Sequence, residues 1–322
     1  MKRFKIRLLL LAFCLLVSVQ TVFGAQFLVP GGQVVGLEVM NQTVTVAAFD
    51  DVLGQAAKDC GLQVGDRITG VNGYVIHSAQ DVKEALRRSD GQAELSVLRG
   101  DRAIKLHIKP AISEEGPKLG VYLKQGITGV GTVTWYDPET GNFGALGHGV
   151  NDANGSLVTM DQGKVYQASV LAVRNGQIGT PGQLMSSVAG DSMIGSLSKN
   201  TEQGVFGQAV LNTTEEKLPV GDKKDVRPGA AVIRSTVSGD RVQEYSVEIL
   251  KVYPNSGPSG RNMLLKITDP ELLASTGGIV QGMSGSPIIQ DGKLVGAVTH
   301  VLVNDPQTGY GIFIENMLEA AS

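Results

Sequence analysis

The residues best suited to chemistry in this sequence are a serine and a histidine, each placed between glycines. Ser284 lies in the stretch Gly282-Met-Ser-Gly-Ser-Pro287, and a serine between glycines on a tight loop can expose its hydroxyl. Backbone N–H groups around such a serine can converge on a developing oxyanion. His148 lies in Ala145-Leu-Gly-His-Gly149, at the end of an expected strand and upstream of the serine. A histidine that accepts the proton of a serine makes it a nucleophile, so this pair suggests acyl transfer.

Composition argues against several other classes of protein. The two cysteines are Cys14 and Cys60, and Cys14 lies in the N-terminal apolar stretch, so no disulfide framework is available. The four histidines are scattered, with no HExxH motif and no cysteine pair at metal-ligand spacing. We therefore expect neither a metal nor a cofactor. Lys and Arg total 28 against 31 Asp and Glu, which gives no basic field for nucleic acid.

The elements that must position these residues are mostly short strands. Glycine accounts for 42 of the 322 residues, and the glycines separate runs of Val, Ile, Thr and Leu. This pattern is typical of many strands joined by tight turns. After Gly120 the expected strands are 131–136, 165–173, 231–236, 242–252, 264–268, 287–289 and 294–298, with a helix only over 315–321. The sequence therefore predicts a mainly β chain whose C-terminal part, 112–322, is a barrel or a pair of barrels.

A smaller α+β domain is expected over residues 30–111. Asn72-Gly73 predicts a tight hairpin, and Ser78 is a good N-cap for a helix that follows it. Two alternating runs around Gly100-Asp101 predict a closing hairpin. The stretch Gly61-Leu-Gln-Val-Gly-Asp-Arg-Ile-Thr-Gly-Val-Asn-Gly-Tyr74 resembles the central signature of PDZ domains. The resemblance implies a groove between a strand and the helix, where an extended peptide terminus or segment adds as a further strand.

The PDZ resemblance also implies that a glycine-rich stretch at the start of this domain is the peptide-binding loop. Within Pro30-Gly-Gly-Gln-Val-Val-Gly-Leu37, the backbone N–H groups of Gly31, Gly32, Gly36 and Leu37 would lie near a peptide carboxylate. The alternative is that these glycines only allow a loop to turn.

The N-terminal residues 1–29 predict export. Four basic residues precede the apolar run 8–19, and small residues follow at Gly24 and Ala25, which is the pattern of a secretory signal. The whole apolar stretch is also about long enough to remain as a membrane anchor. In either case the chain after it is expected outside the cytoplasmic membrane.

The serine loop resembles the Gly-Asp-Ser-Gly-Gly-Pro nucleophile loop of chymotrypsin-like serine peptidases, with Met283 and Ser286 departing from it. The resemblance implies that Ser284 is the nucleophile and that the N–H groups of Gly282 and Ser284 form the oxyanion hole. Ser286 stands where those peptidases have glycine, so it is the weaker candidate. His148 precedes the serine in the order of that family and is the expected base, whereas His300 lies on an expected strand sixteen residues after Ser284.

The chain from about residue 25 onward resembles the stage IV B sporulation peptidase family of endospore-forming bacteria. The residues that carry the resemblance are Gly144-Ala-Leu-Gly-His148, Gly277-Gly-Ile-Val-Gln-Gly-Met-Ser-Gly-Ser-Pro-Ile288 and Val298-Thr-His300. It implies an endopeptidase in the space between forespore and mother cell. Its substrate would be a membrane-associated regulator of an intramembrane protease complex, and cleavage would lead to late sigma-factor activation.

The acid that completes a triad is open from the sequence. The family resemblance implies Asp269, which would hold His148 in the correct tautomer. Asp191 is the rival by the chymotrypsin spacing, Asp152 is near His148 only in sequence, and Asp269-Pro270 is also a common turn. The second functional hypothesis is a non-catalytic exported adaptor, whose PDZ domain binds partners and whose barrel is a degenerate scaffold. The presence of His148, Asp269 and Ser284 together favours the peptidase.

Overall fold

The computed structural model describes residues 26–322, except 153–154 and 258–259. Residues 1–25 of the predicted export segment, 1–29, lie outside the described residues. Within the described ranges, no helix has the length and apolar character needed to cross a bilayer.

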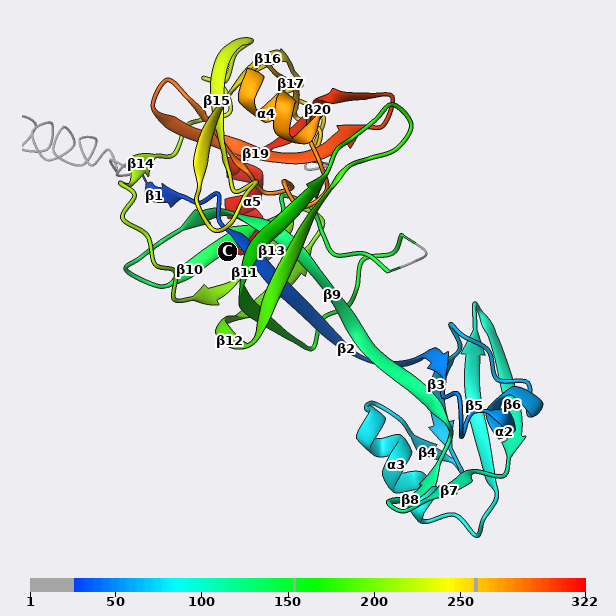
Figure 1. The fold of residues 1–322 in the computed structure, drawn as a ribbon. Coiled ribbons are helices and arrows are strands. Elements are labelled where there is room, and N and C mark those ends of the chain that lie inside the picture. The colour runs from blue at the N-terminus through cyan, green and yellow to red at the C-terminus, as the bar shows by residue number, and fades with distance from the viewer. Residues whose placement is uncertain (1–25, 153–154, 258–259) are drawn as a thin grey trace, which may run out of the picture.

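The first barrel is a ring of antiparallel strands around its own core (Figure 1). In order around the ring the strands are β2 (Val34–Phe49), β9 (Val121–Tyr136), β10 (Asn142–Ala145), β13 (Gly204–Ala209), β12 (Gln183–Thr201) and β11 (Gln162–Arg174). β11 pairs back with β2 and closes the ring. β1 (Phe27–Pro30) extends it by pairing with β9 on one side and with β14 (Leu218–Pro219) on the other. Alternate residues of these strands are buried together, as a closed barrel requires.

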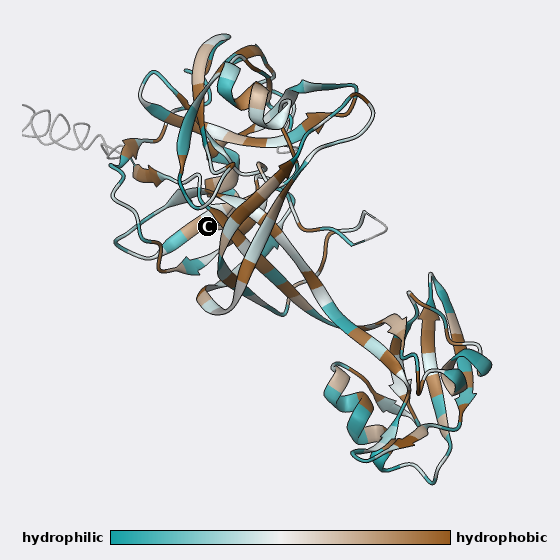
Figure 2. Cartoon of the chain, in the orientation of Figure 1, coloured by the Kyte–Doolittle hydropathy of each residue, from teal (hydrophilic) through white to brown (hydrophobic). Residues whose placement is uncertain are grey.

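The second barrel is closed by the C-terminal strands. Its order is β15 (Gly229–Ser235), β16 (Gln243–Val252), β17 (Met263–Ile267), β20 (Asp305–Phe313), β19 (Lys293–Leu302) and β18 (Pro287–Gln290). The helix α4 (Pro270–Thr276) follows β17, and α5 (Ile314–Ala321) ends the chain. Apolar residues follow the strands of both barrels in Figure 2. The prediction of a mainly β chain with barrel architecture is confirmed.

The smaller α+β domain, called the PDZ domain after its sequence resemblance, has a separate apolar core. Its elements are α2 (Gln55–Asp59), β3 (Arg67–Val71), β4 (Tyr74–Val75), α3 (Ala79–Arg87), β5 (Ala93–Arg99), β6 (Arg102–Ile108), β7 (Ala111–Ser113) and β8 (Gly116–Lys118). The predicted turn forms between β3 and β4, where Asn72 and Gly73 take φ values of 51° and 80°. The predicted N-cap also forms, because Ser78 and Asp81 bond each other's backbone N–H in a capping box.

The PDZ domain is inserted into the first barrel rather than preceding it. The strands β2 and β9 each begin in one domain and end in the other, so the two strands form a ribbon that carries the PDZ domain at its far end (Figure 1). Residues 34–39 of β2 pair with 127–132 of β9 inside the barrel, whereas 44–49 pair with 121–125 inside the PDZ domain. The expected boundary at residue 30 therefore differs from the structure.

The expected peptide-binding loop lies in the first barrel, and that assignment is corrected. Gly36 and Leu37 are part of β2, and Leu37 is buried in the barrel core. Gly31 and Gly32 precede β2 and donate backbone hydrogen bonds to β9. A Cβ at Gly31 would lie 2.2 Å from the carbonyl oxygen of Val133, so close packing against β9 requires glycine there.

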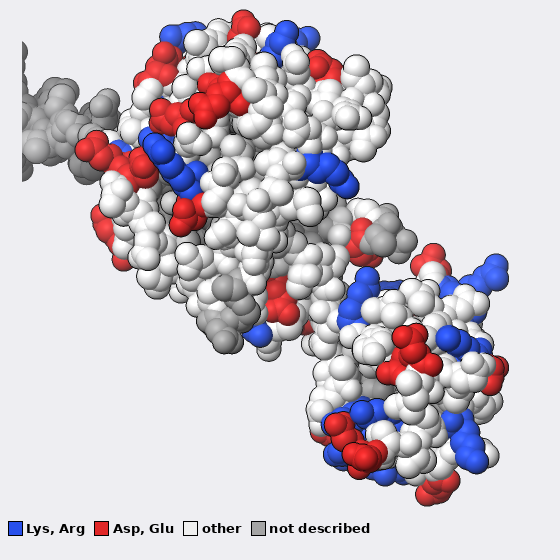
Figure 3. All heavy atoms as spheres, in the orientation of Figure 1, with Lys and Arg blue, Asp and Glu red and all other residues white. Residues whose placement is uncertain are grey.

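Charged residues are distributed differently over the two parts of the molecule (Figure 3). The PDZ domain shows both signs interspersed, whereas much of the face of the two barrels in this view is uncharged. Neither part presents a broad basic surface in this view. The face in this view therefore offers no basic field suited to a polyanion.

Candidate active site

The loop that carries Ser284 is shaped by two glycines with positive φ. Gly282 and Gly285 have φ values of 102° and 98°, a region that residues with a Cβ rarely adopt. A Cβ at Gly285 would also lie 2.0 Å from the carbonyl oxygen of Thr132 on β9. The loop therefore turns tightly between the two barrels and leaves Ser284 partly exposed, while Met283 points into the core of the second barrel.

Two backbone N–H groups of this loop are left without an acceptor among the described residues, those of Gly282 and Ser284. The other N–H groups between them and just after them are used, because Met283 donates to Val280 and Gly285 donates to Val298. Buried backbone donors are nearly always paired, so two unpaired neighbours on a cavity wall form a place for an anion. These are the two groups that the resemblance to chymotrypsin-like peptidases implies for the oxyanion hole.

His148 is brought to the same place by a left-handed turn at the end of β10. Leu146 and Gly147 have φ values of 71° and 68°, and Leu146 is one of few residues other than glycine with positive φ. The Nδ1 atom of His148 lies 2.9 Å from the carbonyl oxygen of Gly149. A carbonyl can only accept, so Nδ1 carries the proton and Nε2 is free to act as a base.

One cavity of about 360 Å³ brings the predicted serine and histidine together. Its lining residues are Val130, Leu146, His148, Ile279, Val280, Gln281, Gly282, Ser284, Thr299, His300 and Val301. The wall is largely aliphatic, and the polar groups are concentrated at the histidines and the serine loop. A site of this kind suits an apolar side chain of a peptide held next to a nucleophile.

A second histidine, His300, lies beside His148. The two ring centroids are 5.4 Å apart, with the ring planes tilted by 40°. Burial lowers the pKa of His148 below its usual value, and the hydrogen bond to Gly149 opposes this only in part. The side chain of His300 is more solvent-exposed than that of His148. Desolvation of its ring beside the cavity, and then the nearby His148 and Arg261, lower the pKa of His300 to about 4. Both imidazoles are therefore neutral at pH 7, the form a general base requires.

The two candidate serines have different environments. The hydroxyl of Ser284 donates to the carbonyl oxygen of Thr299 at 2.9 Å, at the cavity wall. Ser286 is fully buried, and its hydroxyl bonds that of Ser235 at 3.1 Å inside the second barrel. Only Ser284 can therefore meet a substrate without rearrangement of the core.

Neither Asp269 nor Asp152 is among the residues that line this cavity. Asp269 is the N-cap of α4, where Oδ1 accepts from the N–H groups of Glu271 and Leu272 at 3.0 Å each and Oδ2 accepts from Ser246 at 3.2 Å. Asp152 is exposed in a turn, where Oδ1 accepts from the N–H of Ser156. Asp191 lies within β12, and its side chain is outside what the structure describes.

Substitutions of Asp269 should separate the two roles. As a helix cap, Asp269→Ala should lower the free energy of unfolding by about 1–2 kcal/mol, whereas Asp269→Asn keeps a good capping side chain and should cost little. Both folded variants should keep kcat within about tenfold of the parent. A triad acid would behave otherwise, since Asp→Asn there costs about 10⁴ in kcat. Measuring kcat and thermal unfolding on both variants distinguishes the two roles. A 10⁴-fold loss of kcat in a stable Asp269→Asn would identify Asp269 as the triad acid.

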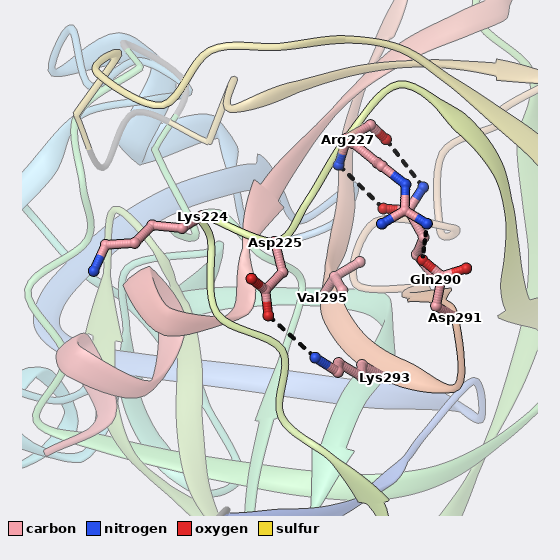
Figure 4. Close-up of a pocket in the computed structure, with 7 residues that line it drawn as sticks. All are labelled: Lys224, Asp225, Arg227, Gln290, Asp291, Lys293 and Val295. Carbon is pink, nitrogen blue, oxygen red and sulfur yellow. Dashed lines mark hydrogen bonds and ion pairs between the residues drawn. The ribbon is translucent and has the colours of Figure 1, made fainter.

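A larger cavity of about 550 Å³ lies on the second barrel and shows no catalytic constellation (Figure 4). Lys293 pairs with Asp225 at 3.1 Å, and Arg227 pairs with Asp291 at 3.0 Å. Gln290 bonds the backbone of Arg227 in both directions. The charged side chains along its wall are therefore largely matched with each other, which distinguishes it from the cavity at Ser284.

Two threonines that the sequence did not single out contact the serine loop from β9. The hydroxyl of Thr132 donates to the carbonyl of Gly282 at 2.7 Å, and that of Thr134 donates to the carbonyl of Gly285 at 2.8 Å. The Thr132 N–H also donates to the carbonyl of Ser284 at 3.0 Å. The Thr-Val-Thr alternation on a buried strand was the available signal, but it does not name a partner about 150 residues away.

Two family profiles match this chain. The profile of the SpoIVB peptidase S55 family matches residues 115–318, and a PDZ domain profile matches residues 52–99. The PDZ domain of the SdrC-like protein Lmo2051 from Listeria monocytogenes is 27% identical and covers 25% of this chain and 85% of that one, with a TM-score of 0.22.

Two solved proteases are similar over a longer stretch. The active form of the Rv3671c protease from M. tuberculosis is 14% identical and covers 60% of this chain and 72% of that one, with a TM-score of 0.36. The HtrA-type protease AlgW with a tripeptide is 14% identical and covers 60% of this chain and 54% of that one, also with a TM-score of 0.36. Because the S55 profile spans well over half of the sequence, the chain belongs to the SpoIVB peptidase S55 family and is a serine peptidase that carries a PDZ domain.

Proposed function

We propose that this protein is an exported serine endopeptidase in which Ser284 is the nucleophile and His148 is the general base. The observation that carries the proposal is the single cavity lined by Ser284, His148 and the loop with two unpaired N–H groups. A degenerate scaffold has no need to keep these three features together, so the adaptor hypothesis is not favoured.

The reaction follows from these groups. On substrate binding the Ser284 hydroxyl turns from the Thr299 carbonyl toward His148, and Nε2 takes its proton as Oγ attacks the scissile carbonyl. The N–H groups of Gly282 and Ser284 then stabilise the tetrahedral oxyanion. Protonated His148 gives the proton to the leaving amine, and a water activated by the same histidine releases the acyl group.

The Gly149 carbonyl supplies the orientation that a carboxylate supplies in a complete triad. It keeps the proton of His148 on Nδ1 and leaves Nε2 free to accept a proton. A carbonyl dipole stabilises an imidazolium less than a full negative charge does. We therefore propose a Ser284–His148 pair as the minimal catalytic unit, with Asp269 stabilising α4.

The PDZ domain is proposed to recruit peptide segments through the free edge of β9. Residues 121–125 pair with β2 on one side, and no described strand pairs with their other edge. The helix α3 contacts this part of β9 and buries Val82, Ala85 and Leu86 in the common core. A peptide could add as a strand in this groove, which replaces the glycine-rich stretch 31–37 as the binding site.

Excision of the PDZ domain should separate recruitment from chemistry. Val39 and Ile127 are cross-strand partners, so replacing residues 40–126 with Asn-Gly should close β2 and β9 into a tight hairpin. We expect the excised enzyme to cleave a short unstructured peptide at a rate within about tenfold of the full chain. It should lose most cleavage of a protein substrate that carries a segment bound by the PDZ domain.

Two rate measurements, one on the short peptide and one on the protein substrate, test whether the PDZ domain serves recruitment and not cleavage itself. A matched protein substrate without the PDZ-binding segment serves as control and should be cleaved equally by both enzymes. Equal loss on the short peptide and the protein would indicate that the insertion supports the fold of the barrel. Absence of peptide cleavage by the full chain would contradict the peptidase assignment itself.

The biological setting is proposed from the sequence and from the family. The basic and apolar N-terminal residues support export, either as a cleaved signal or as a membrane anchor. Membership of the S55 family supports a role in sporulation signalling, with a membrane-associated regulatory protein as the substrate. Cleavage there would control a late sigma factor through an intramembrane protease complex.

A further inference from the structure

We propose that Thr132 and Thr134 are positioning residues that hold the oxyanion hole of this peptidase in its working shape from β9. Neither residue faces the cavity, so both act through the serine loop and not on substrate. The inference rests on the proposed function, because the loop that the two threonines hold is the one proposed to form the oxyanion hole.

The hydrogen bonds of the loop show how the threonines act. The carbonyls of Gly282 and Gly285 accept from the two threonine hydroxyls, and the Ser284 carbonyl accepts from the Thr132 N–H. Three loop carbonyls are thus turned toward β9. The N–H groups of Gly282 and Ser284 remain without an acceptor among the described residues, and both residues line the cavity. Because the three loop carbonyls are bonded to β9, the N–H groups of Gly282 and Ser284 remain available to the cavity.

Hydroxyl chemistry, and not just side-chain volume, is needed at these positions. Both threonines are fully buried on a barrel strand, where valine would have nearly the same shape and a better match to apolar surroundings. The Val133 side chain between them packs in the core of the first barrel, as alternation along a strand requires. The two hydroxyls therefore face the neighbouring barrel, where both of their partners belong to the nucleophile loop.

Without the threonine hydrogen bonds the serine loop can adopt other backbone conformations. Gly282 and Gly285 have no Cβ to restrict their dihedral angles, so hydrogen bonds have to select one conformation. If the Gly282 carbonyl loses the Thr132 hydroxyl, the adjoining peptide groups can rotate to find another donor. The N–H groups would then be aimed away from the oxyanion, which lowers transition-state stabilisation and leaves ground-state binding almost unchanged.

The test compares Thr132→Val with Thr132→Ser in the full-length enzyme, using one peptide substrate and one peptidyl boronic acid. The boronic acid reports the oxyanion hole directly, because Ser284 Oγ bonds to boron, its proton passes to His148, and a boronate oxygen occupies the hole. Removing one oxyanion donor outright costs about 10²–10³ in kcat, so an indirect loss should cost about 10–100-fold. We expect Thr132→Val to lower kcat by that factor with KM within about twofold, and to weaken the boronic acid in parallel.

Two controls keep the outcome specific. Thr132→Ser should restore kcat to within a few fold of the parent, because it returns the hydroxyl. Thr236→Val removes another buried threonine hydroxyl, which bonds the Gly32 carbonyl at 2.9 Å, and should affect thermal unfolding without changing kcat. Thr134→Val provides a second variant with a predicted loss in the same direction, should Thr132→Val fail to fold.

Three results would overturn the inference. These are an unchanged kcat in folded Thr132→Val and Thr134→Val, a rise in KM in place of the fall in kcat, and a Thr132→Ser variant as slow as the valine variant. In each case the parent enzyme still cleaves the peptide and binds the boronic acid, so the proposed function stands. Failure of the parent itself to do either would instead refute the proposed function, and this inference with it.

Discussion

Ser284→Ala should abolish proteolysis, with kcat falling by about 10⁶, while the protein remains folded. The magnitude is that found when a catalytic serine is removed from an enzyme that works through a serine and a histidine. Ser284 is partly exposed and its hydroxyl makes one hydrogen bond, to the Thr299 carbonyl, so its loss should change stability by about 1 kcal/mol or less. Steady-state cleavage of a peptide, together with a thermal unfolding curve, measures both effects.

Ser286→Ala is the matched control for this variant. Ser286 is two residues away but fully buried, and its hydroxyl bonds that of Ser235. Its loss should cost about 1 kcal/mol of stability and leave most of the activity. An active Ser284→Ala alongside an inactive Ser286→Ala would reverse the assignment of the nucleophile.

His148→Ala should reduce kcat by about 10⁵–10⁶, because removal of the base costs nearly as much as removal of the nucleophile. His300 lines the same cavity and is the fair comparison. No described group bonds its imidazole, whereas the Gly149 carbonyl orients that of His148. We expect His300→Ala to lose no more than about tenfold to a hundredfold. The opposite ranking in kcat would identify His300 as the base.

The pH profile provides an independent check on the same residue. Burial lowers the pKa of His148 below 6.5, and the neutral form is the one that accepts the proton of Ser284. The value of kcat/KM should therefore be constant at neutral pH and fall only as the pH drops through this lowered pKa. The titratable neighbour of His148 is His300, whose own pKa is lowered by burial, by His148 and by Arg261. An acidic limb with a midpoint above 6.5 would be incompatible with this environment.

The Ser284 loop and the His148 turn could be predicted because the residues that shape each of them are adjacent in the sequence. A serine and a histidine each needed glycines to turn the chain, and the structure supplies the positive φ values at Gly147, Gly282 and Gly285 that explain them. The same holds for the PDZ turn at Asn72 and the N-cap at Ser78, since both depend on residues no more than three positions apart. The role of Ser284 as nucleophile stays a prediction until it is measured.

Contacts between segments that are far apart in the chain could not be predicted from the sequence. The glycine-rich stretch 31–37 was interpreted as a loop, but a strand that packs closely on β9 requires glycine for a different reason. The insertion of the PDZ domain could not be foreseen, because each of β2 and β9 is one continuous run of strand residues that serves two domains. Thr132 and Thr134 went unnoticed for the same reason, as their partners are about 150 residues further along.

The central claim is that the Ser284 hydroxyl, activated by His148, is the reacting group of this protein. A fluorophosphonate probe tests it most directly, because the probe bonds covalently to an activated serine and loses fluoride in the process. Incubation of the full chain, followed by mass spectrometry of its peptides, should place the label on Ser284. Labelling should be absent from Ser284→Ala and strongly slowed in His148→Ala. No label on the folded parent protein, or a label on another serine that survives in Ser284→Ala, would contradict the account.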